Sequence, residues 1–69
     1  MAYFESNYMN KFKVEKFVRL CDELLDLPYE IEQYGDKYSI VIFGIETTYQ
    51  IETVQRINRH VYHGQYQSF

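Results

Sequence analysis

Three sets of residues in this sequence have side chains and spacings that could do chemistry. Glu30 and Glu32 are two residues apart in an alternating segment, so both carboxylates can point to one strand face as an acid and base pair. His60 and His63 are three residues apart, which puts two imidazoles on one helical face for a divalent metal. Cys21 is the only thiol in the chain and a candidate nucleophile.

Each of these sets lacks a part that its chemistry needs. An acid and base pair requires a buried cleft that separates the two pKa values, and a short hairpin offers little cleft. A catalytic zinc requires a third protein ligand, and the sequence has no HExxH pattern. Cys21 lies within the apolar stripe of an amphipathic helix, where it packs as a small core residue. The sequence therefore predicts no catalytic residue, no metal site, no cofactor and no enzymatic activity.

The acidic residues are concentrated in the middle of the chain, although the formal net charge is only −3. Charge of one sign gathered on a small domain creates a local field that steers partners. Tyrosines, which are common at interfaces, are interspersed among these acids. We therefore expect a surface that binds a basic partner protein, formed by Asp22, Glu23, Asp26, Tyr29, Glu30, Glu32, Tyr34 and Asp36.

The basic residues lie on either side of this acidic segment and leave a second function open. Lysine and arginine side chains near aromatic residues can bind nucleic acid through its phosphates and bases. The alternative function is therefore a small nucleic-acid-binding or regulatory domain. Its contacts would come from Lys11, Lys13, Lys16 and Arg19, with Arg56 and Arg59. The acidic net charge favours the protein-binding function, without direct contact to nucleic acid.

Apolar periodicity predicts a helix over about residues 9–25. One helical face follows the i, i+1, i+4, i+7, i+8 pattern and consists of Phe17, Val18, Cys21, Leu24 and Leu25. Asn7 or Asn10, which precede this stripe, can cap the helix. Pro28 cannot continue the helix, because proline lacks the backbone N–H that a helical residue donates.

An alternating segment at 29–34 and an apolar segment at 37–45 predict a β-hairpin. Gly35-Asp36 suits a two-residue type II′ turn, because glycine accepts the positive φ of the first position. In this register Glu30 faces Val41, and the second strand is apolar on both faces. Its second face needs cover, from the C-terminal segment or from another molecule. We expect a homodimer, through Val41, Phe43 and Ile45.

The C-terminal segment has two possible structures. Thr47 and Gln50 fit a capping box, and apolar residues then recur at helical spacing, which favours a helix over about 48–62. Residues 48–54 also alternate and are rich in strand formers, so a strand stays open. With loose ends at 1–7 and 64–69, the expected fold is α+β, one domain over 1–69 with the order helix, strand, strand, helix.

The composition narrows the class of protein. Eight Tyr and five Phe with a single Pro argue against an intrinsically disordered chain. A lone cysteine indicates a reducing compartment. The longest apolar stretch, residues 40–45, is too short to span a bilayer, and residues 1–5 have no basic, apolar leader. We expect a cytoplasmic protein that does not enter a membrane.

In size, acidity and lack of catalytic motifs, the whole chain resembles the small host-takeover proteins that bacteriophages make early in infection. Several of those proteins are DNA mimics. The resemblance implies an inhibitor in the host cytoplasm that docks on a nucleoid-associated or other DNA-binding protein. It further implies that the six acids from Asp22 to Asp36 imitate phosphates, while Tyr29 and Tyr34 add apolar contact.

Overall fold

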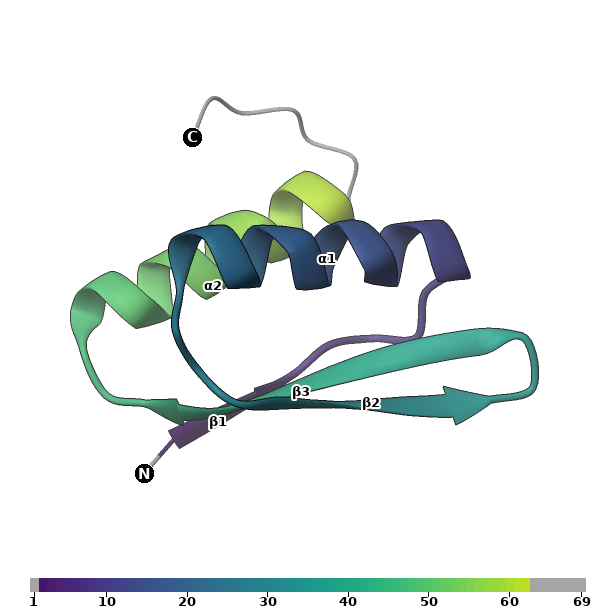
Figure 1. Cartoon of the computed structure of the whole chain (residues 1–69), viewed down its shortest axis with the longest axis horizontal. Helices are drawn as coiled ribbons and strands as arrows, with labels where there is room; N and C mark the ends of the chain where they lie inside the picture. The colour runs from purple at the N-terminus through teal and green to yellow at the C-terminus, as the bar shows by residue number, and fades with distance from the viewer. Residues whose placement is uncertain (1, 63–69) are drawn as a thin grey trace.

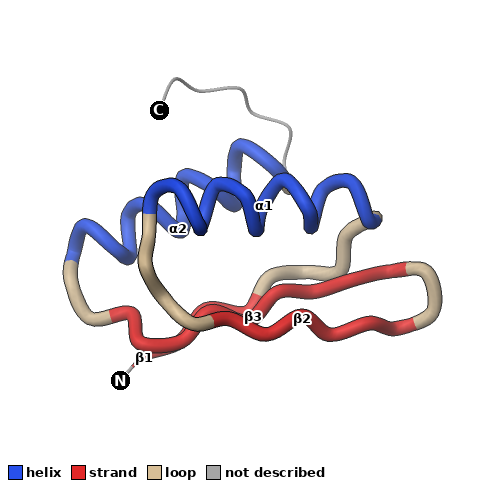
Figure 2. The backbone as a smooth tube through the Cα atoms, in the orientation of Figure 1, coloured by secondary structure: helices blue, strands red, loops and turns tan. Residues whose placement is uncertain are grey.

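The computed structural model describes residues 2–62, which form a three-stranded antiparallel sheet with two helices on one face (Figures 1 and 2). The strand order is β1-β3-β2, so β3 is central. The elements are β1 (Ala2–Glu5), α1 (Lys11–Leu24), β2 (Tyr29–Tyr34), β3 (Lys37–Ile45) and α2 (Thr48–Val61). The α+β fold expected from the sequence is confirmed.

Helix α1 begins directly after its N-cap residue, Asn10. The Asn10 side chain accepts a hydrogen bond from the backbone N–H of Lys13 at 2.9 Å, so Asn10 and not Asn7 is the N-cap. The helix buries Val14 together with Phe17 and Cys21 of the predicted apolar stripe, and it ends before Pro28 as expected.

The hairpin has the predicted register. Glu30 pairs with Val41 and Glu32 with Ser39, and the strands meet at the turn where Tyr34 pairs with Lys37. Gly35 has φ of +63°, and no described residue other than glycine has a positive φ. A type II′ turn needs a positive φ at its first central residue and a negative φ at its second, whereas a type I′ turn needs two positive φ angles.

Helix α2 begins at a capping box. Thr47 Oγ1 accepts from the Gln50 N–H at 3.1 Å, and Gln50 Oε1 accepts from the Thr47 N–H at 3.0 Å. The helix buries Thr53, Val54, Ile57 and Val61. The expected helix is confirmed, and the alternative strand over 48–54 is wrong.

The expectation of a loose lead-in at residues 1–7 is wrong for residues 2–6. Ala2–Glu5 forms β1, which pairs antiparallel with β3, and the Phe4 ring stacks on Phe17 with centroids 6.1 Å apart. A four-residue strand gives little periodic signal of its own; its stability comes from hydrogen bonds to a distant segment. Residues 64–69, expected to be loose as well, lie outside the described residues.

Two buried serines continue the pairing beyond the end of β1. The Ile40 N–H donates to Ser6 Oγ at 3.0 Å, and Ser39 Oγ donates to the Ser6 carbonyl at 2.8 Å. The Ser6 N–H donates to the Ile40 carbonyl at 2.9 Å. These hydroxyl groups take the place of the regular strand ladder, so the buried backbone groups of Ser6 and Ile40 remain paired.

Ile45 does not lie on the second face of the sheet, where the strict alternation of residues 37–45 placed it. Gly44 has φ of +76°, and the β1–β3 register shifts beside it. This irregularity turns the next side chain to the helix-covered face, and Ile45 is only 5% exposed in the core. The prediction of Ile45 as a self-association residue is therefore wrong.

The core lies between β3 and the two helices. Phe17, Ile40, Ile42, Val54 and Ile57 are almost completely buried there. Within residues 2–62, neither helix is long and apolar enough to cross a membrane.

Gly44 gives a first test of this fold. A Cβ at this position meets only Leu27 Cδ2, at an ordinary 3.8 Å, so the strain of a substitution lies in the backbone. We expect Gly44→Ala to lower the free energy of unfolding by about 1–2 kcal/mol, because a left-handed φ is unfavourable for alanine. Urea unfolding measures this change. Gly44→Asn is the control and loses less, since asparagine tolerates this conformation; equal losses would contradict the explanation.

Cys21 gives a second test, through pH. Burial raises the pKa of its thiol from 9.0 to about 12, and the negative charge of Asp22 adds to the shift. The unfolded chain therefore releases this proton at a lower pH than the folded chain. The contribution of this thiol to stability is intact below pH 9 and is lost as the pH rises toward about 12. Urea unfolding across this range measures the loss.

The Cys21→Ala variant separates the contribution of this thiol from every other effect of alkaline pH on stability. Its stability is lower at neutral pH, because the truncation leaves a cavity in the core. Its further loss between pH 9 and about 12 is smaller than that of the wild type. An identical alkaline loss in both proteins contradicts the assigned cause.

Candidate functional site

The helices cover one face of the sheet, and among residues 2–62 no helix or strand lies over the other (Figures 1 and 2). Phe4, Ile40 and Ile42 pack in or against the core, so the residues that alternate with them point the opposite way. We call this second surface the open face. It consists of Tyr3, Glu5, Glu30, Glu32, Tyr34, Lys37, Ser39, Val41 and Phe43.

An apolar centre flanked by carboxylates occupies the open face. Val41 pairs with Glu5 of β1 on one side and with Glu30 of β2 on the other. Adjacent strands are about 4.8 Å apart, so the two glutamates lie about 10 Å apart across Val41. Glu32 follows Glu30 by two residues, about 7 Å along the strand. The three glutamates are exposed, while Val41 and Phe43 are half-buried.

Aromatic rings close one end of the open face. Tyr8 and Tyr34 flank opposite sides of β3, and their ring centroids are 6.1 Å apart. Both rings are largely exposed, and Ser39 between them is fully buried. Lys37 brings one positive charge to this end, against the three carboxylates of Glu5, Glu30 and Glu32. The open face therefore keeps an excess of negative charge.

The structure divides the eight residues predicted to bind a partner and does not gather them on one surface. Glu30, Glu32 and Tyr34 share the open face. Asp22 and Glu23 are exposed on the last turn of α1, and Asp26 is exposed in the loop after it. Asp36 lies at the hairpin turn, at the opposite end of the 33 Å long axis from the end of α1 (Figure 1). Tyr29 packs half-buried against the core.

Sequence reasoning missed the part of the open face that comes from the N-terminal segment. Tyr3 and Glu5 belong to β1, and Tyr8 comes shortly after it. The alternation of Tyr3, Phe4 and Glu5 was the available signal, but so short a pattern also occurs in loops.

The basic residues of α1 lie on the helix layer, away from the open face. Lys11, Lys16 and Arg19 are exposed, and the Phe12 side chain is 83% exposed among them. Lys13 Nζ donates to the Tyr62 carbonyl at 3.1 Å and lies 5.8 Å from the centre of its ring. The basic start of α1 therefore adjoins the end of α2, whose last turn also carries Arg59 and His60.

The candidate chemical groups occupy unlike environments. Glu30 and Glu32 are exposed to water, and Cys21 is buried in the core. His63, the second histidine of the candidate pair considered for a metal, lies outside the described residues. Within 2–62, no group of three or more His, Cys, Asp or Glu side chains could hold a metal ion.

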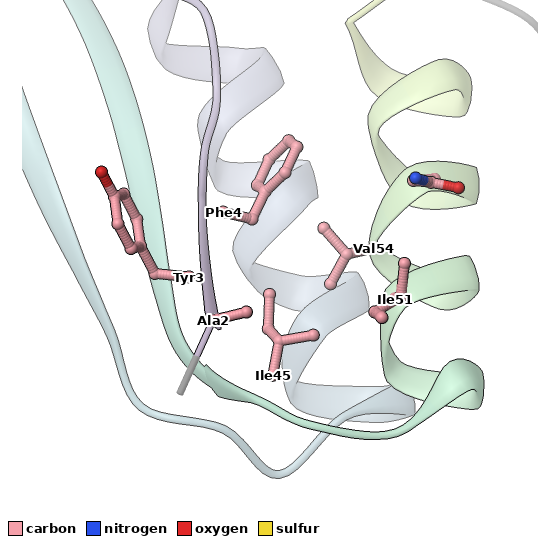
Figure 3. Close-up of a pocket in the computed structure, with 7 residues that line it drawn as sticks. Ala2, Tyr3, Phe4, Ile45, Ile51 and Val54 are labelled. Carbon is pink, nitrogen blue, oxygen red and sulfur yellow. The ribbon is translucent and has the colours of Figure 1, made fainter.

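An apolar groove of about 270 Å³ separates β1 from α2 (Figure 3). Tyr3 points away from the α2 residues in this view, while Ile51 and Val54 approach β1. The lining consists of Ala2, Tyr3, Phe4, Ile45, Ile51, Val54 and Gln55. Because it includes no carboxylate, imidazole, amine or thiol, the groove suits apolar contact and not acid–base chemistry.

Comparison with known proteins adds no family to this description. No family model matches the chain, and neither a curated protein nor a solved structure matches it. The function is therefore inferred from the chemistry of the open face.

Proposed function

We propose that this protein is a non-enzymatic protein-binding module whose open face docks on a basic partner. The observation that carries the proposal is the row Glu5–Val41–Glu30, in which an apolar residue lies between two exposed glutamates on neighbouring strands. Interfaces commonly combine an apolar, aromatic-rich centre with a polar rim. The open face has these parts: Val41 and Phe43 form the centre, carboxylates lie beside it, and Tyr34 lies at its end.

Charge selects the partner. Lysine and arginine side chains on a partner would pair with Glu5, Glu30 and Glu32, and the excess negative charge speeds the encounter at low salt. The backbone that carries the carboxylates is fixed in a sheet, so their spacing is set before binding and only side-chain freedom is lost. The partner is therefore a protein with a basic, partly apolar surface.

A second copy of the chain suits the open face less well. An isologous contact through Val41 and Phe43 would set Glu5, Glu30 and Glu32 of one copy close to the same residues of the other. Bringing like charges together while removing them from water costs several kcal/mol. The open face is thus better matched to an unlike, basic protein than to itself.

The resemblance to early bacteriophage proteins indicates which class of protein the partner belongs to. Lysine and arginine sites that hold DNA phosphates would also accept carboxylates spaced along a rigid sheet. We propose that Glu5, Glu30 and Glu32 occupy such sites on a bacterial DNA-binding protein, and that the chain inhibits this protein in the host cytoplasm. The helix-end acids Asp22 and Glu23 belong to a different surface and are not needed for this contact.

Capture and charge reversal test the proposal. Tagged wild-type protein is used to capture proteins from nuclease-treated bacterial lysate, and the captured basic protein is then purified. Its affinity is measured for the wild type and for the Glu5→Lys/Glu30→Lys double variant. We expect the affinity to fall about 100-fold or more, because two attractive charges become repulsive. Addition of the wild-type chain should also displace DNA from the captured protein.

The Glu15→Lys/Glu46→Lys double variant is the matched control. Its change in net charge is the same, but Glu15 is an exposed residue of α1 and Glu46 is exposed between β3 and α2. It should bind almost as the wild type does. Equal losses of affinity for the two double variants would mean that only net charge matters, and the proposed location of the docking site would be wrong. Recovery of nucleic acid from lysate without nuclease, with no protein partner, would favour binding through Lys11, Lys16 and Arg19 instead.

A further inference from the structure

The outer edge of β1 is unpaired in the described part of the chain. The strand order β1-β3-β2 leaves β1 with one partner, β3. The Ser6 N–H donates to the Ile40 carbonyl of β3. Backbone polar groups alternate in direction along a strand, so those of Phe4 also point to β3, while those of Tyr3 and Glu5 point to the outer edge. An edge of this kind is a template for another strand.

The groove beside this edge has an exposed apolar side chain on its α2 wall. Ile51 is 43% exposed there and approaches β1, whereas the Tyr3 side chain points away from α2 (Figure 3). Sites for drug-sized ligands occupy about 300–1,000 Å³. At about 270 Å³ the groove is smaller and has the size for inserted side chains.

The flank of α2 that borders the groove carries no charge. Ile51, Gln55 and Asn58 follow i, i+4, i+7 along this flank, and Ile51 and Gln55 line the groove. The neighbouring stripe, Glu52, Arg56 and Arg59, has the same spacing and is charged throughout. It is negative toward the start of the helix and positive toward its end.

We propose that a second copy of this chain docks here, with the two β1 strands paired antiparallel about a two-fold axis. The two three-stranded sheets then join into one sheet of six strands, and the two α2 helices pack antiparallel beside the axis. Ile51 of each copy contacts the groove of the other. The antiparallel arrangement also sets Glu52 of one helix toward Arg59 of the other, so the charges are complementary.

A second copy fits this surface better than an unlike partner. An isologous contact needs a patch that complements itself, and each copy here supplies a groove, an adjacent apolar side chain and a free strand edge. The lining of the groove is uncharged, so the contact between grooves and α2 helices brings no like charges together. The two Glu5 carboxylates near the axis stay on the open faces in water, where their repulsion is small. Sixty-nine residues also bury a modest core, for which self-association is a common source of added stability.

Sedimentation velocity over a range of concentrations tests the proposal. We expect the wild type to be a dimer at micromolar concentration, and Ile51→Lys to be a monomer there, because each lysine would bring an unpaired charge to the apolar groove of the other copy. Gln55→Lys is a second variant, at an exposed groove residue where we expect replacement to leave the fold intact. It should weaken the dimer in the same direction. Circular dichroism checks that each variant is folded.

Ile31→Lys is the matched control. Ile31 is 47% exposed, close to the 43% of Ile51, but it belongs to β2 at the other edge of the sheet. This variant should remain a dimer. A monomeric wild type at high micromolar concentration overturns the proposal. A dimer that survives Ile51→Lys and Gln55→Lys but dissociates in Phe43→Ser also overturns it, since the contact would then lie on the open face.

Discussion

The whole structure depends on β3, a strand that is apolar on both faces and paired on both edges. Strands of this kind belong inside a protein, covered on each side. In this chain β1 and β2 satisfy its hydrogen bonds, and α1 and α2 cover the face that carries Ile40 and Ile42. Within residues 2–62 no further element covers the other face. Val41 and Phe43 are shielded only by neighbouring side chains, and those neighbours include glutamates. The open face is thus a consequence of the fold as well as a candidate site.

Local signals were sufficient to predict most of this fold. The apolar stripe of α1, the Gly35 turn and the capping box at Thr47 each determine the backbone within a few residues, and each is found where the sequence indicated it. The misses depend on contacts far apart in sequence. Ala2–Glu5 becomes a strand because β3 has a free edge, and Ile45 enters the core because Gly44 breaks the alternation. The open face contains residues from β1, β2 and β3. Which residues share it is decided by how these strands pair, and no single segment of the sequence shows that.

The charges of α1 run against the dipole of their own helix. Its first turn carries Lys11 and Lys13, and its last turn carries Asp22 and Glu23, whereas the dipole favours the reverse arrangement. Packing accounts for Lys13, which donates to the Tyr62 carbonyl at the end of α2. Among residues 2–62, no hydrogen bond of this kind explains Asp22 and Glu23. Charges that do not help their helix are better explained by what they meet outside it, and they give the helix layer one basic and one acidic end.

The two proposed contacts use different surfaces and are compatible. Pairing through β1 extends the sheet in its own plane, so it leaves the open faces of both copies uncovered and on the same side. Glu5, at the outer edge of each open face, would then lie near the axis, and the two rows of Glu5, Val41 and Glu30 would continue across the joined sheet. A partner that is itself two-fold symmetric would meet both rows at once, and the second contact would form at a high effective concentration. Two open faces of modest charge would in this way act as one larger acidic surface, which the net charge of a single chain does not provide.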